Sequence, residues 1–139
     1  MRRSFIILLL FVLAASAGCS KKQVKPVPEG AVYYNNANKI IQVLRNGYAA
    51  KDPGIIKAVS TQNGLNAIVP NLGRFDSVEL TFTTKWVDVS NGGATVNVEW
   101  KGVWTKDGKK DSESGMAVFV LTGNPLKFDK ILTGNPFIY

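Results

Sequence analysis

The fold is decided by the stretch from Val78 to Trp104, which reads VELTFTTKWVDVSNGGATVNVEWKGVW. Apolar and polar residues alternate along it, so that one face of an extended chain is apolar and the other is polar. Asn91-Gly92-Gly93 interrupts the alternation in the middle, and glycine after asparagine is typical of a hairpin turn. The stretch therefore predicts two consecutive antiparallel strands, each with one buried face.

The length of the connecting loop sets which residues of the two strands lie opposite each other. A two-residue turn would mix polar with apolar side chains on both faces, whereas a three-residue loop at 91–93 gathers the large side chains on one face. The loop pairs Ser90 with Ala94, and the pairs that follow are Trp86–Val98, Thr84–Trp100 and Leu80–Trp104. The residues expected to face the helices are Leu80, Phe82, Trp86, Val96, Val98, Trp100, Ala117 and Phe119.

Further strands follow toward the C-terminus. Asp107-Gly108 predicts a second hairpin turn, which sets Trp100 opposite Gly115 and Val96 opposite Phe119. The run from Gly115 to Leu121 is apolar on both faces, as in a central strand, and residues 128–132 complete a set of at least four antiparallel strands.

The segment before the strands is helical. Apolar residues between 32 and 50 recur at helical spacing and form one stripe, made of Ala37, Ile40, Ile41, Leu44 and Tyr48. Asp52-Pro53 starts a second helix, because Asp is a preferred N-cap and Pro is tolerated at the first helical position. Asn63-Gly64 is expected to end that helix, with a further turn or two at 65–72. The predicted fold class is α+β, with the N-terminal helices packed on one face of an antiparallel sheet of four or more strands.

The composition excludes several kinds of chemistry. The chain has 139 residues, with 17 Lys plus Arg, 10 Asp plus Glu, no His and one Cys. Without histidine there is no imidazole base or metal ligand, and a single cysteine forms neither an intramolecular disulfide nor a thiolate zinc site. We therefore expect no metal and no organic cofactor.

The first nineteen residues predict export and lipid attachment. Two arginines precede an apolar run over 5–15, which is too short to cross a bilayer, and small residues then lead to Cys19. The string Ser16-Ala17-Gly18-Cys19 resembles the lipobox of a bacterial lipoprotein signal, although that family usually has Leu where Ser16 stands. The resemblance implies cleavage before Cys19 and lipidation of its thiol, and Ser20 implies retention at the outer membrane, facing the periplasm. An ordinary cleaved signal with an incidental cysteine, or a short buried helix, is the alternative.

Three segments follow from this assignment: a signal peptide over residues 1–18, the lipidated cysteine and a flexible tether over 19–30, and a single domain over 31–139. The tether carries Lys21, Lys22 and Lys25, which either attract anionic lipid headgroups or simply keep a linker solvated. The domain has 12 basic and nine acidic residues. A net charge of +3 is too small to indicate nucleic acid as a partner.

Three strings lie at the ends of the predicted elements: Tyr48-Ala49-Ala50-Lys51-Asp52-Pro53, Ala94-Thr95-Val96-Asn97-Val98-Glu99-Trp100 and Gly134-Asn135-Pro136-Phe137. With the order of helices and strands, they resemble the nuclear-transport-factor-2-like superfamily over roughly residues 31–139. Cystatin-like and other helix-on-sheet folds share the coarse order. The resemblance implies a cone, formed by a curved antiparallel sheet wrapped around a long N-terminal helix.

Enzymes of that superfamily, such as ketosteroid isomerase and scytalone dehydratase, place an Asp, Tyr or His inside the cone. Here Tyr48 lies on the helical stripe and Asp88 continues the inward parity of its strand, but a helical aromatic is usually core and an Asp beside a turn usually ends a strand. The three tryptophans share one strand parity and form either an aromatic pocket or packed core, and Trp104, near the Asp107-Gly108 turn, is expected to be the most exposed of them. We assign no catalytic, cofactor or metal residue, and the candidate pocket residues are Tyr48, Trp86, Asp88, Trp100 and Trp104.

Two functions remain open. The first is a lipid-anchored periplasmic or outer-membrane module that binds or assembles with another envelope component without catalysis. Met116, Val118 and Val120 lie on the sheet face away from the helices, where they could meet a partner protein or a second copy in a homodimer. The alternative is a small-molecule binder, or a lyase- or isomerase-like enzyme, that uses the cone pocket.

Overall fold

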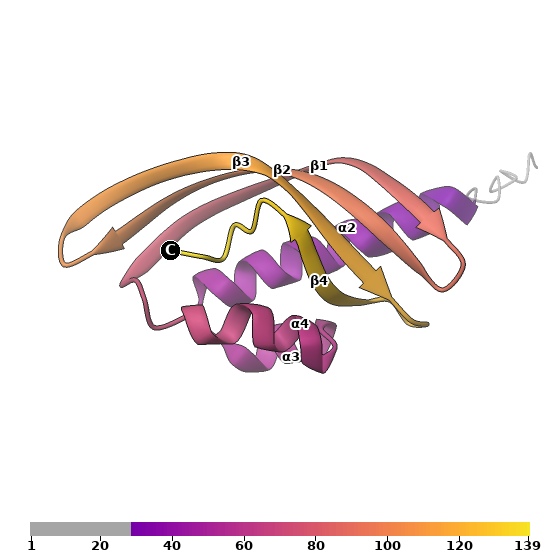
Figure 1. Cartoon of the computed structure of the whole chain (residues 1–139), viewed down its shortest axis with the longest axis horizontal. Helices are drawn as coiled ribbons and strands as arrows, with labels where there is room; N and C mark the ends of the chain where they lie inside the picture. The colour runs from indigo at the N-terminus through magenta and orange to yellow at the C-terminus, as the bar shows by residue number, and fades with distance from the viewer. Residues whose placement is uncertain (1–28) are drawn as a thin grey trace, which may run out of the picture.

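The computed structural model describes residues 29–139, in which the helices come first and the sheet follows (Figure 1). The predicted signal peptide, Cys19 and the tether up to residue 28 lie outside the described residues. Within residues 29–139, no helix combines the length and the apolar character needed to cross a membrane.

The helices begin with the long one that the apolar stripe predicts. α2 spans Glu29–Ala49, α3 spans Pro53–Val59 and α4 spans Gln62–Ile68, with a 3-10 helix, η1, at Val69–Asn71. The predicted cap of α3 is confirmed: a carboxylate oxygen of Asp52 accepts hydrogen bonds from the backbone N–H groups of Gly54 and Ile55, at 2.8 and 3.2 Å.

The sheet is a four-stranded antiparallel meander. β1 spans Ser77–Ser90, β2 spans Gly93–Lys106, β3 spans Lys109–Thr122 and β4 spans Lys127–Thr133, and the strands lie in the order of the sequence. Figure 1 shows the sheet arching over α2, with the helices on its concave side. The predicted fold class, N-terminal helices on one face of a curved antiparallel sheet, is therefore confirmed.

The predicted register of β1 against β2 is wrong along the whole strand pair, by one residue near the turn and by two residues beyond Lys85. Ser90 pairs with Gly93, so the turn has two residues, Asn91 and Gly92, with Gly92 at a φ of +84°. A bulge in β1 at Lys85 adds a second residue to this shift, because Thr84 pairs with Val98 while Trp86 pairs with Asn97. A shift of two residues leaves Leu80 and Phe82 on the predicted face. The bulge inserts one extra residue and reverses which side chains face the helices.

Because of the bulge, two of the predicted orientations, those of Trp86 and Asp88, are wrong. Before it, Phe82 pairs with Trp100, and both side chains point inward and are buried. After it, Trp86 and Asp88 point away from the helices, and 51% of Trp86 is exposed. The pairs Trp86–Val98, Thr84–Trp100 and Leu80–Trp104 do not form; Leu80 lies opposite Gly102, and Trp104 lies opposite Val78.

The predicted register of β2 against β3 is confirmed. Trp100 lies opposite Gly115 and Val96 lies opposite Phe119, around the two-residue turn at Asp107-Gly108. Both turn residues have positive φ, at 49° and 74°, as a tight hairpin turn with the twist of the strands requires.

The break between α3 and α4 lies earlier than predicted. Thr61 caps α4 by accepting a hydrogen bond from the N–H of Gly64 at 3.2 Å, so Asn63-Gly64 lies inside α4. Gly64 is buried, and a Cβ atom there would collide with the backbone carbonyl of Phe128 in β4. The glycine is explained by the close approach of α4 to β4 rather than by a helix end.

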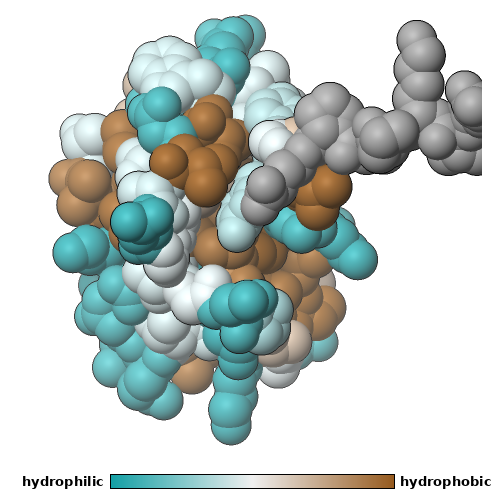
Figure 2. Space-filling view, turned by 90° about the vertical axis from the view of Figure 1, so that its right-hand side faces the viewer, coloured by the Kyte–Doolittle hydropathy of each residue, from teal (hydrophilic) through white to brown (hydrophobic). Residues whose placement is uncertain are grey.

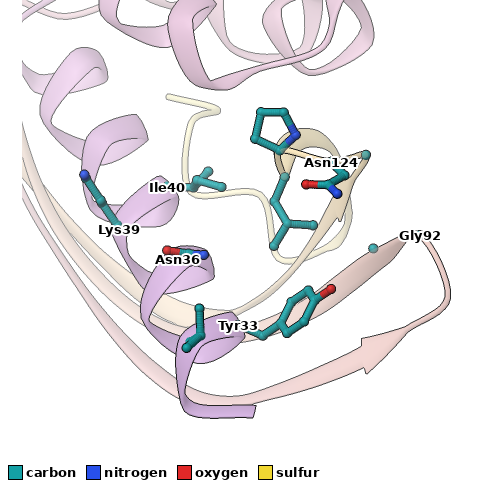
Figure 3. Close-up of a pocket in the computed structure, with 11 residues that line it drawn as sticks. Tyr33, Asn36, Lys39, Ile40, Gly92 and Asn124 are labelled. Atoms are coloured by element: carbon teal, nitrogen blue, oxygen red, sulfur yellow. The ribbon is translucent and has the colours of Figure 1, made fainter. Parts of the chain in front are cut away.

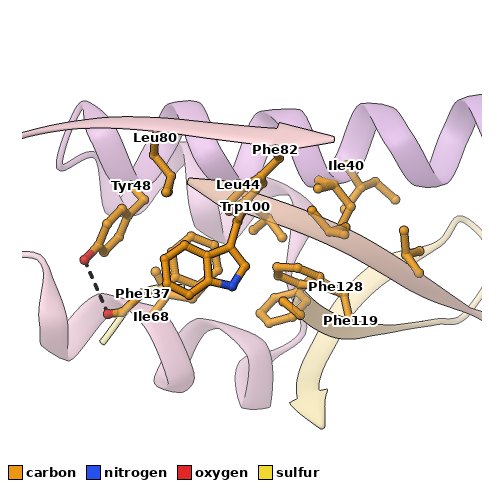
Figure 4. Packing of buried hydrophobic residues seen from close by; sticks show 14 of the residues in the cluster. Ile40, Leu44, Tyr48, Ile68, Leu80, Phe82, Trp100, Phe119, Phe128 and Phe137 are labelled. Carbon is orange, nitrogen blue, oxygen red and sulfur yellow. Dashed lines mark hydrogen bonds between the residues drawn. The ribbon is translucent and has the colours of Figure 1, made fainter. Parts of the chain in front are cut away.

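A single hydrophobic core fills the space between the helices and the concave face of the sheet (Figure 4). The whole predicted stripe of α2 is buried in it. The residues predicted to face the helices are buried as well, with the exception of Trp86. Burial of this apolar surface is the main force that holds the sheet onto α2.

Candidate functional site

The candidates Tyr48 and Trp104 lie together in the core, so the expectation that Trp104 is the most exposed tryptophan is wrong. Both are completely buried, and the indole Nε1 of Trp104 donates a hydrogen bond to the Tyr48 hydroxyl at 3.3 Å. That hydroxyl donates in turn to the backbone carbonyl of Phe137 at 3.4 Å (Figure 4). Burial raises the pKa of Tyr48 above its ordinary value, although the hydrogen bond from Trp104 and the charge of Arg74 act in the opposite direction.

Aromatic rings occupy the interior around this pair. Tyr48 contacts the rings of Phe75 and Phe137, each at a centroid distance of 4.9 Å, and Trp104 stacks on Tyr139 at 5.5 Å. Trp100 is 7% exposed, and its indole N–H has no hydrogen-bond partner among the described residues. In residues 29–139 the structure thus gathers Tyr48, Trp100 and Trp104 in a packed core.

The other two sequence candidates lie elsewhere. Trp86 and Asp88 are exposed on the convex side of β1, where the bulge at Lys85 places them. Strand parity predicts that Asp88 points inward, as Tyr48 does. Because Asp88 is exposed on the convex side, its carboxylate does not lie beside the buried Tyr48 hydroxyl. Within residues 29–139, no group of three or more His, Cys, Asp or Glu side chains is placed to hold a metal ion.

A pocket of about 710 Å³ lies at one end of the molecule, which we call the open end. Three segments form this end: the start of α2, the β1–β2 turn and the β3–β4 connection, which lie together on the right of Figure 1. The residues lining this end pocket are Val32, Tyr33, Asn36, Lys39, Ile40, Gly92, Gly93, Gly123, Asn124, Pro125 and Leu126. Its volume falls within the range of small-molecule sites in proteins.

Glycines make two walls of the end pocket. Gly92 and Gly123 have φ values of +84° and +87°, which a residue with a side chain rarely adopts, and the N–H of Gly123 donates to the carbonyl of Gly92 at 2.9 Å. Gly93 has no room for a Cβ atom, since one would meet the carbonyl of Leu121. The turns therefore approach each other without side chains, and space is left between them and α2.

The lining is mostly apolar with a few polar groups. Figure 3 shows Tyr33, Asn36 and Ile40 extending from α2, with Asn124 on the opposite wall. The two asparagine amides can donate and accept hydrogen bonds, and Lys39 is the one charged residue of the lining. The apolar side chains of the lining offer contact area to a ligand, and its amides, together with Lys39, offer hydrogen bonds.

Sequence patterns did not reveal the end pocket, because its lining comes from three segments far apart in the chain and two walls are backbone. The available signal was the occurrence of two turn sequences, Asn-Gly-Gly at 91–93 and Gly-Asn-Pro at 123–125, at the same end of a meander. In an antiparallel meander, the turn after β1 and the turn after β3 lie at the same end.

Comparison with known proteins supports the fold. No family model matches the chain, and no match was found among the curated proteins. A solved structure, a nuclear transport factor 2 (NTF2-like) superfamily protein from Salmonella enterica subsp. enterica serovar Typhimurium str. LT2, superimposes with a TM-score of 0.65 at 14% identity. The match covers 78% of this chain and 99% of that chain. At this identity the likeness shows the fold, which is the cone-like α+β arrangement that the sequence resemblance predicts.

Proposed function

We propose that this protein is a lipid-anchored envelope protein whose domain binds a small, largely apolar ligand in the end pocket and catalyses no reaction. The end pocket carries the proposal: it combines apolar side chains, one tyrosine ring, two amides and a single charged side chain, Lys39. Such a lining gives affinity through apolar contact and orientation through hydrogen bonds. The packed interior around Tyr48 supports the same conclusion, because its hydroxyl is already engaged by Trp104 and Phe137.

The anchor is proposed from the sequence, in which the single cysteine follows an export-type leader directly. Lipidation of Cys19 would hold the domain at the outer membrane, facing the periplasm, since two or three acyl chains anchor firmly where one binds marginally. Labelling of cells with a radioactive fatty acid tests this. We expect label in the wild-type protein and none in Cys19→Ala, and equal labelling of the two would contradict the anchor.

Binding is tested with an uncharged alkyl alcohol that carries a photoreactive diazirine, added to vesicles holding the full-length protein. We expect cross-links to concentrate on residues 32–40 and 123–126. Asn36→Trp should reduce them, because the indole would occupy the pocket from its α2 wall. Asn35→Trp is the matched control, since Asn35 is exposed on the same helix turn but does not line the pocket. Cross-links spread evenly over the domain, or equal labelling of the two variants, would contradict the proposal.

A further inference from the structure

Exposed apolar side chains are concentrated at the open end. Val32, Tyr33 and Tyr34 are 45%, 36% and 40% exposed on the first turns of α2, and Val89 is 48% exposed at the end of β1. Tyr33 and Val89 line one shallow cavity, so the two elements present a continuous surface. We call these four residues the end face. Figure 2 views this end directly and shows brown, hydrophobic patches among pale and teal, hydrophilic ones.

The open end is also free of charge over long stretches of sequence. Three stretches that build it, residues 30–38, 89–98 and 117–126, contain no charged side chain. The charged residues that border these stretches are Glu29, Lys39, Asp88, Glu99 and Lys127. The opposite end of the molecule, at the β2–β3 hairpin on the left of Figure 1, has six charged residues among residues 106–113. One end of the long axis is thus suited to a less polar environment and the other to water.

The length of chain between Cys19 and α2 limits how far the open end can lie from a membrane that holds Cys19. α2 begins at Glu29, so nine residues, 20–28, separate Cys19 from the start of the helix that carries most of the end face. Fully extended, such a segment reaches at most about 35 Å, which keeps the open end close to any membrane that holds Cys19. A weak surface affinity is sufficient in this arrangement, because tethering raises the effective concentration of the surface to the millimolar range.

We propose that the end face rests on the headgroup layer of the bilayer that holds the lipid anchor, so that the end pocket opens toward the membrane. Tyrosine is one of the residues enriched at membrane interfaces, where its ring meets the acyl boundary and its hydroxyl meets water. Val32 and Val89 add apolar area beside the two rings. In this orientation the pocket receives molecules that partition into the bilayer. The inference rests on the proposed lipid anchor and adds an orientation to it.

Spin labels on the full-length, acylated protein in phosphatidylethanolamine–phosphatidylglycerol vesicles test the orientation. Because Cys19 is the one native cysteine and is blocked by acylation, an introduced cysteine takes the nitroxide alone. Tyr34→Cys probes the end face, and Ser112→Cys is the matched control, at an exposed site near the far hairpin. We expect the nitroxide at position 34 to be about threefold less accessible to a water-soluble nickel chelate than the one at 112, and more accessible to oxygen.

Two results would overturn the inference. Equal, fully aqueous accessibility at both positions would show that the end face does not touch the bilayer. Protection at position 34 that disappears when the protein is diluted in the membrane would show that a second copy covers it instead. Failure of the anchor is distinguishable, because a protein without acylated Cys19 would not float with the vesicles at all.

Discussion

The indole Nε1 of Trp104 in β2 donates to the hydroxyl of Tyr48 in α2, and that same hydroxyl donates to the carbonyl of Phe137 in the C-terminal segment. One oxygen atom therefore connects three parts of the chain that are far apart in sequence. Because all three residues are completely buried, each polar group of this set depends on the others for a partner.

Removal of that oxygen should destabilise the domain. Tyr48→Phe keeps the ring but leaves the Trp104 N–H and the Phe137 carbonyl buried without this partner. We expect a loss of about 1–2 kcal/mol in the free energy of unfolding, since both hydrogen bonds are long and each unpaired group costs roughly 1–3 kcal/mol. Denaturant titration measures it. Tyr34→Phe, which removes an exposed hydroxyl, should change stability by less than about 0.5 kcal/mol, and equal losses in the two variants would show that the buried hydroxyl contributes nothing.

The same tyrosine should weaken the fold at alkaline pH. Burial raises the pKa of Tyr48 in the folded state, whereas in the unfolded chain it titrates near 10. Above about pH 10 the unfolded state therefore binds fewer protons than the folded state, and stability falls as the pH rises; below that pH the contribution is complete. Urea midpoints measured between pH 8 and pH 11 should fall more steeply for the wild type than for Tyr48→Phe. Parallel curves would contradict the assignment, because other titrating groups are common to both proteins.

The regular elements could be predicted because their patterns are set by burial. The stripe from Ala37 to Tyr48 has the helical period, and Asp107-Gly108 permits one tight turn, which fixes Trp100 opposite Gly115. The register of β1 could not be predicted in the same way. Its bulge lies at Lys85 after two consecutive threonines, which are compatible with either face, so the alternation gives no sign of the extra residue.

The candidate site was less accessible to sequence reasoning. The sequence places Tyr48 and Trp100 inward, but it predicts Trp104 to be the most exposed tryptophan, whereas Trp104 is completely buried. The pattern also does not distinguish a packed core from a lined pocket, because that depends on how completely rings such as Phe75 and Phe137 fill the space. The end pocket depends on the spatial meeting of two turns and a helix. Its glycine walls carry no side-chain pattern from which it could be predicted.

Fluorescence quenching should identify Trp86 as the exposed tryptophan. Trp86 is 51% exposed, whereas Trp100 and Trp104 are 7% and 0% exposed. We expect iodide to quench one component of the tryptophan emission in the wild type and to have little effect on Trp86→Phe. The substitution should change the free energy of unfolding by less than about 1 kcal/mol, since it alters a surface position. Undiminished quenching in Trp86→Phe would mean that the bulge does not turn this side chain outward.

Gly134 links β4 to the C-terminal segment that brings Phe137 into the core, and two separate features prevent any other residue there. Its φ is +65°, and a Cβ atom would overlap the backbone carbonyl of Met116 in β3. Gly92 shares the first feature without the second, because its φ is +84° but a Cβ atom there would meet nothing within 4 Å. Gly73 has neither a positive φ nor an atom within 4 Å of a Cβ atom placed there. Comparison of the three positions therefore distinguishes the cost of backbone strain from the cost of a collision.

Alanine substitutions at these three glycines should therefore form an ordered series. Gly73→Ala should be neutral or stabilising by up to about 1 kcal/mol, because alanine restricts the unfolded chain. Gly92→Ala should cost about 1–2 kcal/mol from the left-handed backbone conformation. Gly134→Ala should cost more than about 3 kcal/mol, because the colliding atom is backbone and β3 or the C-terminal segment must move, which disturbs the packing of Phe137. Denaturant midpoints of the three variants measure the order, and a Gly134→Ala protein as stable as Gly92→Ala would mean that the C-terminal segment does not pack this closely against β3.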